Sequence, residues 1–111
     1  MVLQDYCNAA LSNTKTAVSA SRVRIHSFVL YNPNTAVAFV QFFNKAIADV
    51  TVGTTAPKKS IPVPPGGVAV GTYEDDFALP YNEGLVLAAT TTASGSTAPT
   101  SALVVASLDY S

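Results

Sequence analysis

The sequence is poor in charge, and it has no tryptophan, one cysteine and one histidine. Six Lys and Arg residues against seven Asp and Glu residues give a formal net charge of -1, with no run of basic residues. Nucleic-acid phosphates need a concentrated positive surface, so DNA and RNA are not expected partners. The single Cys7 excludes an intrachain disulfide, and the single His26 excludes a zinc site built on several histidines of one chain. We expect no cofactor and no metal.

Long apolar runs are also missing. No stretch approaches the roughly 20 apolar residues that cross a bilayer as a helix. The opening MVLQDYCNAALSNT lacks the charged start and the apolar core of a signal peptide. We therefore expect no membrane partner, and the lone thiol favours folding in a cytoplasm.

Apolar residues are plentiful for so short a chain. Its 111 residues are enough for one domain, and 49% of them are hydrophobic while 12% are charged. An ordinary soluble domain has about 25% charged residues. This composition predicts that part of the surface is buried against other protein, in a homo-oligomer or a larger assembly.

Turn residues and β-formers alternate along the chain. Clusters of Gly, Pro, Asn and Ser separate segments rich in β-branched residues at intervals typical of a sandwich. The pattern predicts an all-β fold over residues 21–111, an antiparallel, jelly-roll-like β-sandwich of about eight strands. Residues 1–20 are interpreted as short strands or as an arm that orders on a partner. Strands are expected at 22–31, 36–43, 58–63, 68–73, 85–92 and 102–110.

Two of these strands carry further expectations about pairing. The short connection around Asn32-Pro33-Asn34 predicts that 22–31 and 36–43 form an antiparallel hairpin. Pro62 in the segment 58–63 and Pro64 just after it remove backbone donors, which predicts an edge strand or a segment that crosses between sheets. The adjacent Lys58 and Lys59 would discourage other chains from adding to that edge.

The segment 36–43 is apolar on both of its alternating faces. Because a two-sided apolar strand is covered on both sides, we expect the core on one face and another layer or a subunit on the other. Alternation does not say which face is which. The candidate core or subunit contacts form two sets, Val37, Phe39 and Phe43 on one face and Val40 and Phe42 on the other. Further interior residues are expected at Phe28, Leu85, Leu87, Val104 and Leu108.

Residues able to carry catalysis are sparse. Arg24 and Phe28 alternate onto the same strand face as His26, which suggests a partly buried or interfacial imidazole. A catalytic base would need a nucleophile nearby, and Cys7 has no motif that places it there. We therefore expect no enzyme.

The acidic group of Glu74, Asp75 and Asp76 is the densest cluster of charge. It does not match an EF-hand loop, so a solvated loop is favoured over a calcium site or a contact with a basic partner. Arg22 and Arg24 lie two residues apart on one side of a strand and are expected either to face solvent or to contact a neighbouring subunit. The arginines and the acidic group are the candidate contacts with a capsid or another partner.

Part of the chain resembles a known group of proteins. The residues are those from VRIHSFVLYNPNTAVAFVQFFNKAIADVTVGTTAPKKSIPVPPGGVAV through YNEGLVLAATTTASGSTAPTSALVVASLDYS. Within them, Asn44 to Pro64 is the most specific stretch. In this order they resemble small β-sandwich structural proteins of tailed phages, of the capsid decoration, cement or head-fibre type.

The resemblance implies a virion structural protein without catalytic residues. The expected role is a decoration or cement protein on the outer capsid surface, made in the host cytoplasm and bound to the major capsid protein. It would be a homo-oligomer, more readily a trimer than a dimer. The alternative is a receptor- or glycan-binding knob of a head or tail fibre, with the Thr-rich loops at 51–55 and 90–100 touching sugars. A knob normally follows a long shaft, whereas this chain starts almost directly at the sandwich.

Overall fold

The computed structural model describes residues 3–73 and 79–111, and about half of these residues are in β-strands. Their one helical element is a single 3-10 turn, η1 (Ile47–Asp49). Among the described residues, no helix is long and apolar enough to cross a membrane. The strands are β1 (Gln4–Leu11), β2 (Thr16–Ser19), β3 (Val23–Tyr31), β4 (Ala38–Phe43), β5 (Lys59–Val63), β6 (Val68–Thr72), β7 (Leu79–Tyr81), β8 (Leu85–Thr90) and β9 (Leu103–Tyr110).

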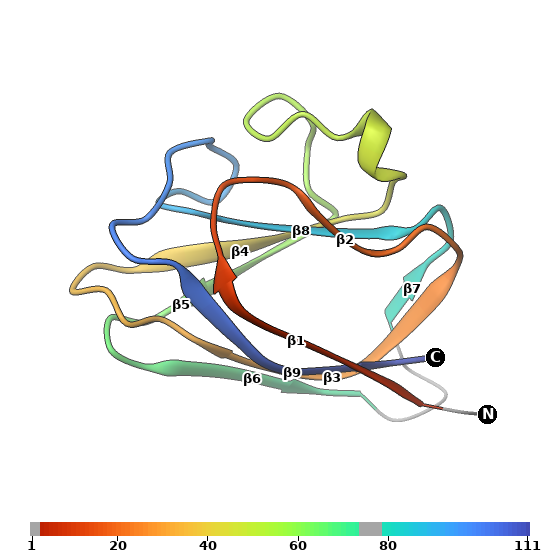
Figure 1. The fold of residues 1–111 in the computed structure, drawn as a ribbon, viewed down its shortest axis with the longest axis horizontal. Coiled ribbons are helices and arrows are strands. Elements are labelled where there is room, and N and C mark those ends of the chain that lie inside the picture. The colour runs from red at the N-terminus through yellow and green to blue at the C-terminus, as the bar shows by residue number, and fades with distance from the viewer. Residues whose placement is uncertain (1–2, 74–78) are drawn as a thin grey trace.

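The strands form two antiparallel sheets packed face to face (Figure 1). The first sheet has the order β1-β9-β3-β6, and β7 continues along the same side of β3 as β6. The second sheet has the order β2-β8-β4-β5. Chain neighbours such as β1 and β2, or β8 and β9, therefore lie in opposite sheets, which is the connectivity of a jelly roll. The sequence prediction of an antiparallel, jelly-roll-like sandwich is confirmed.

The predicted hairpin between residues 22–31 and 36–43 is wrong. β3 lies in the first sheet and β4 in the second, so the connection at 32–37 crosses between sheets. Asn32, which is fully buried, holds this corner: its Nδ2 donates to the carbonyls of Ala36 and Val63 at 2.9 and 3.0 Å. Its Oδ1 accepts a hydrogen bond from the backbone N–H of Asn34 at 2.9 Å. A short turn-rich connection is thus compatible with a sheet crossing when a buried side chain satisfies the corner.

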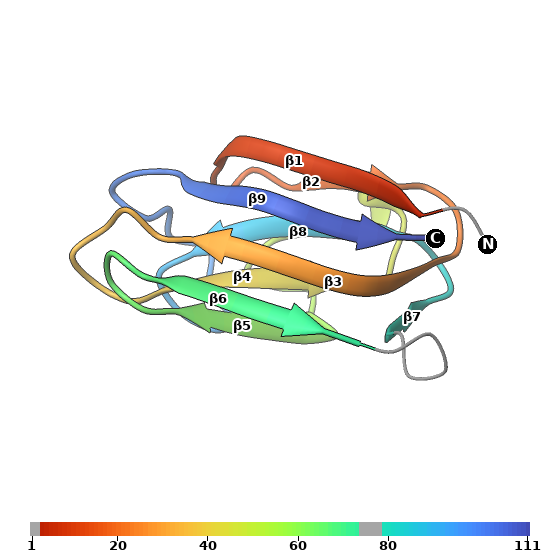
Figure 2. The same ribbon diagram turned by 90° about the horizontal axis from the view of Figure 1, so that it is seen from below.

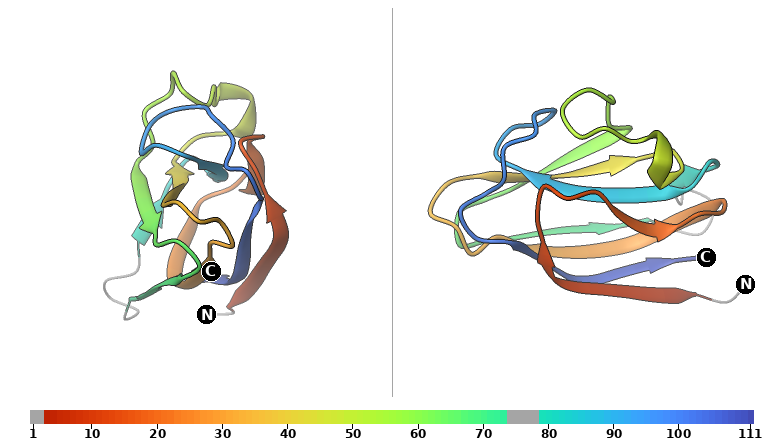
Figure 3. Two further views of the ribbon diagram at one scale, coloured as in Figure 1. Left: turned by 90° about the vertical axis from the view of Figure 1, so that its left-hand side faces the viewer. Right: turned by 45° about the horizontal axis from the view of Figure 1, so that its top comes forward.

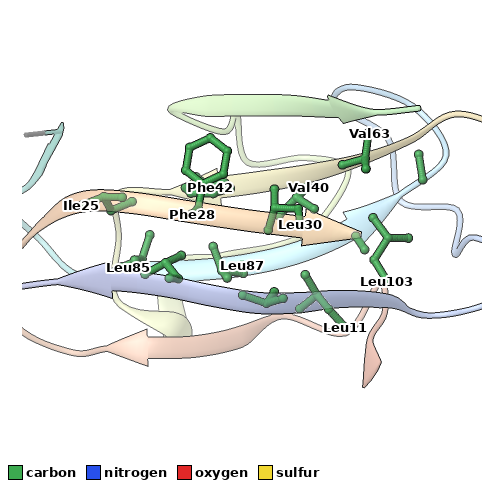
Figure 4. Packing of buried hydrophobic residues seen from close by; sticks show 14 of the residues in the cluster. Leu11, Ile25, Phe28, Leu30, Val40, Phe42, Val63, Leu85, Leu87 and Leu103 are labelled. Carbon is green, nitrogen blue, oxygen red and sulfur yellow. The ribbon is translucent and has the colours of Figure 1, made fainter. Parts of the chain in front are cut away.

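The core lies between the sheets and is almost entirely aliphatic and aromatic (Figure 4). Phe28 of β3 and Phe42 of β4 meet across it edge to face, with ring centroids 5.7 Å apart. Tyr81 of β7 packs beside Phe42, with the two ring centroids 6.4 Å apart. Burial raises the pKa of the Tyr81 phenol, and Tyr73 adds to the effect, so this ring stays neutral.

The outer face of the second sheet is covered by the chain itself. Phe43 is fully buried in a small second cluster with Val50, Val86 and Ala88, and Val52 packs against it. The loop at 44–57, which contains η1, passes over this face (Figures 1 and 3). The layer expected on the second apolar face of β4 is therefore, at Phe43, a loop of the same chain.

Two β-bulges change which side chains point inward. On β3, Ile25 pairs with Tyr110 and Ser27 with Asp109, so His26 is an extra residue that breaks the alternation. Arg24 is consequently exposed whereas Phe28 is buried, and the expectation that they share a face is wrong.

On β9 the extra residue is Ala106, because Leu30 pairs with Val105 and Val29 with Ser107. Val105 and Leu108 therefore both reach the core. Val104 does not, which corrects its predicted place in the interior. The other four residues predicted for the interior, Phe28, Leu85, Leu87 and Leu108, are buried there.

Candidate functional site

Figure 2 views the first sheet from its outer side. This outer surface carries a group of apolar side chains, which we call the apolar face. Tyr31 of β3 lies directly opposite Val68 of β6 on one side and Val104 of β9 on the other. Val29 lies opposite Val70. Val70 is 66% exposed, Val68 51% and Tyr31 38%. The apolar face thus consists of Val29, Tyr31, Val68, Val70 and Val104, in register across three strands.

The sequence of β6 explains why large apolar side chains point outward. Its inward residues, Ala69 and Gly71, are small, whereas Val68 and Val70 face solvent. Gly71 pairs with Phe28, and a Cβ at this glycine would lie 2.4 Å from the Phe28 ring. The aromatic ring therefore fills the inner side of β6. The usual order, large residues inside and small or polar ones outside, is reversed on this strand.

Polar groups bound the apolar face toward the other end of the same sheet. The Ser27 hydroxyl donates to Asp109 Oδ2 at 2.9 Å, and Asp109 lies opposite Asp5 on β1. An apolar region with a polar border is the usual anatomy of a protein contact surface. The apolar face is the strongest candidate for a functional surface in the described part of the chain.

The five candidate contacts on segment 36–43 do not form one surface. Val40 and Phe42 point into the main core, and Phe43 lies under the 44–57 loop. Phe39 is half-buried, and Val37 is 43% exposed next to the corner at 32–37. Neither residue belongs to the apolar face. The sequence signal for that face was the pair Val68 and Val70, which alternation puts on one side without showing that the side is outward.

The other candidate residues are scattered. Arg22 and Arg24 are exposed, and Glu74, Asp75 and Asp76 lie outside the described residues. Within the described part of the chain, no group of three or more His, Cys, Asp or Glu residues could hold a metal ion.

Cys7 and His26 are not neighbours either. The Cys7 thiol donates to the Ala106 carbonyl at 3.3 Å, and His26 Nε2 is 2.8 Å from the Ser111 hydroxyl. Cys7 lies on β1 and His26 on β3, and β9 separates these two strands. The backbones of β1 and β3 are therefore about 10 Å apart. The structure does not bring them together as a catalytic pair.

The two lysines near β5 reach across to the first sheet. Lys58 Nζ donates to the Pro80 carbonyl and lies 4.7 Å from the centre of the Tyr81 ring. Lys59 Nζ lies 6.0 Å from the centre of the Tyr73 ring. The positive charge predicted to protect this edge therefore also joins the two sheets through carbonyl and aromatic contacts.

A hollow of about 220 Å³ opens at the end of the sandwich, where the corner at 32–37 meets the loop at 99–101. Asn34 supplies the most versatile polar group of its lining, but its amide is already engaged. Its Nδ2 donates to Asn32 Oδ1 at 2.7 Å and to the Ser101 carbonyl at 2.9 Å. Its Oδ1 accepts a hydrogen bond from the Ser101 N–H at 2.7 Å. The hollow is thus walled mainly by hydroxyl and small apolar groups.

The Thr- and Ser-rich loop after β8 is anchored by a buried amide. Gln41 of β4 is fully buried, and its Nε2 donates to Thr90 Oγ1 at 2.7 Å and to the Gly95 carbonyl at 3.0 Å. Asn13 Nδ2 donates to the Ser96 carbonyl at 3.0 Å. The loop is therefore tied to β4 and to the β1-β2 connection.

Replacing Gln41 should loosen this loop without unfolding the domain. We expect Gln41→Leu to lower the free energy of unfolding by about 1–2 kcal/mol. The loss is moderated because the substitution also removes Oε1, which is buried without a partner. Amide exchange should quicken at residues 91–97. The control is Gln4→Leu on the exposed part of β1, and unchanged exchange at 91–97 in the Gln41 variant would contradict the anchoring role.

Comparisons of the chain with protein-family models, with curated proteins and with solved structures found no match. The resemblance to phage structural proteins therefore stays a prediction from the residues.

Proposed function

We propose that this chain is a structural protein of a tailed-phage particle, a decoration or cement protein that binds the outer capsid surface. The partner is the major capsid protein, and the action is stabilisation of the shell by contact alone, without a cofactor. The observation that carries the proposal is the apolar face, a set of five in-register side chains on the outer surface of the jelly roll.

The physical basis is the removal of apolar surface from water. Each contact between the apolar face and the shell would contribute roughly 25 cal/mol for every Å² of apolar area buried. Expansion or rupture of the shell would expose that area again, so the contact opposes both. One contact of this kind is modest, but a capsid lattice repeats it many times. The low charge of the chain suits this mode, because apolar burial needs no opposite charge on the partner.

The test uses particles assembled without the protein, to which purified protein is added back. With the wild-type chain we expect the particles to retain DNA to a higher temperature. Tyr31→Asp places a charge in the middle of the apolar face and should weaken binding by about tenfold or more. The control is Val37→Asp, which adds the same charge to an exposed valine outside the face. Equal shell protection by both variants would refute the proposed surface.

A fibre knob that binds host glycans is the second candidate. The hollow at the loop end favours it, because Thr35, Thr91 and Thr100 present hydroxyl groups there. Deletion of the gene separates the two functions. Normal heat stability with loss of adsorption to the host would support the knob, and early DNA release with normal adsorption would support the decoration protein.

A further inference from the structure

The outer strands of the two sheets differ in how well their free edges are protected. β5 contains Pro62 and begins at Lys59. β1 has two register shifts and carries Asp5, and β2 has only four residues with a register shift of its own. Prolines, charges, bulges and short length are the usual means by which an edge strand avoids pairing with another chain. β6 has none of them: its five residues are uncharged, contain no proline and pair with β3 without a register shift.

The register of β6 shows which of its backbone groups face outward. Asn32 N–H donates to the Gly67 carbonyl and Tyr73 N–H donates to the His26 carbonyl, at 3.0 and 2.7 Å. In an antiparallel ladder, hydrogen-bonded positions alternate, so Gly67, Ala69, Gly71 and Tyr73 face β3. The N–H and C=O groups of Val68, Val70 and Thr72 therefore point away from β3. Figure 2 shows β6 at the border of the first sheet, on the side of β3 opposite to β9.

We infer that two copies of this chain pair through β6, antiparallel and across a twofold axis at Val70. In that register Val70 lies opposite Val70 of the other copy. Val68 of each copy lies opposite Thr72 of the other. These three pairs, with two hydrogen bonds each, satisfy every outward N–H and C=O group of Val68, Val70 and Thr72. The contact uses the same patch on both copies, so it closes at two subunits and does not propagate.

The side chains favour a second copy of the chain over an unrelated extended segment. On the outer face, every cross-strand pair in this register joins two β-branched residues, a favourable combination on a sheet surface. No charge lies on β6, so the twofold brings no like charges together. Pairing would also place the two apolar faces side by side on one continuous sheet. This deepens the proposed function by giving the capsid a twofold apolar surface, and it favours a dimer over the trimer predicted from the sequence.

The first measurement needs no variant and no capsid. Sedimentation equilibrium of the full chain should show a transition from 11.5 kDa to twice that mass as concentration rises. Hydrogen exchange should show, over the same range, new protection at the amides of Val68, Val70 and Thr72. The amides of Ala69 and Gly71, already bonded to β3, should be protected at every concentration. This alternation distinguishes edge pairing from stacking of the two apolar faces.

The second measurement compares two substitutions at the twofold. Val70→Pro removes an N–H that β3 does not use, and an edge strand tolerates proline at such a position. Because one hydrogen bond is lost from each copy, the dissociation constant of the dimer should rise by about tenfold or more. Val70→Thr retains the N–H and the β-branched shape, so the dissociation constant should stay close to the wild-type value.

Three outcomes would overturn the inference. One is a monomer at all concentrations, and another is a dimer whose Val68, Val70 and Thr72 amides exchange freely. A trimer would also overturn it. If Val70→Pro does not fold, the exchange pattern of the wild-type chain decides alone. Capsid binding is measured separately with Tyr31→Asp, so a chain that binds shells as a monomer would refute the dimer and leave the proposed function standing.

Discussion

Phe42→Ala should lower the free energy of unfolding by about 3–5 kcal/mol, the usual cost of truncating a fully buried phenylalanine. Phe42 has no exposed surface and contacts two aromatic rings of the opposite sheet, Phe28 of β3 and Tyr81 of β7. Because these rings are held by separate strands, they cannot both move in to fill the space, and a cavity should remain. For a domain whose total stability is about 5–15 kcal/mol, the loss is a large fraction. Urea unfolding monitored by circular dichroism measures it.

The matched control is Phe39→Ala on the same strand. Phe39 points to the outer side of β4 and is half-buried, so its truncation leaves a surface depression that water can enter. We expect this variant to lose clearly less stability than Phe42→Ala. Equal losses would mean that the two faces of β4 are buried alike, which would bring back the idea that a partner covers the outer one.

The contrast between Phe39 and Phe42 also shows which features of the fold could be predicted from the sequence. The strands at 22–31, 36–43, 58–63, 68–73, 85–92 and 102–110 correspond to β3, β4, β5, β6, β8 and β9 with small differences at their ends. Density of β-branched residues and turn clusters suffices for this, because both are local properties. Alternation also separated Phe39 from Phe42 correctly. It could not say that Phe42 faces the core, since that depends on which loops cover the sheet.

The errors have a common physical origin in single residues inserted into strands. His26 on β3 and Ala106 on β9 each shift the phase of alternation by one, so Arg24 and Val104 point outward where regular alternation sends them inward. A bulge has no strong sequence signature when the inserted residue is an ordinary strand former. The apolar face depends on the second of these bulges, because it contains Val104. The apolar face could therefore not be predicted from the sequence pattern, although the strands β6 and β9 were.

The hairpin error has a different origin, and it leads to the last prediction. A connection of this length can join paired strands or carry the chain to the other sheet, and the choice rests on long-range contacts of Asn32. Its side chain is fully buried and donates to the carbonyls of Ala36 and Val63, 31 residues away along the chain in the second case. No neighbouring residue predicts a partner at that separation.

Asn32→Asp should be as damaging as Phe42→Ala although it hardly changes the shape of the side chain. The substitution replaces an NH2 group that donates to two carbonyls with a carboxylate oxygen that both carbonyls repel. A buried charge facing acceptors costs about 3–5 kcal/mol when it has no counter-ion. The same exchange at exposed Asn13 removes one surface hydrogen bond and should cost less than about 1 kcal/mol.

The pH dependence of the Asn32→Asp variant separates the effect of the buried charge from the loss of the NH2 donors. Burial and the facing carbonyls should raise the pKa of the new carboxyl in the folded state above its unfolded value. The folded state then binds the proton more tightly than the unfolded state does, so stability increases as the pH falls through the folded pKa. A protonated carboxyl can also donate to one of the two carbonyls. Unfolding midpoints measured from pH 8 to about pH 4 should therefore show the variant approaching the wild-type chain in acid. A gap that stays constant over this range would show that the loss comes from the missing NH2 donors and not from the buried charge.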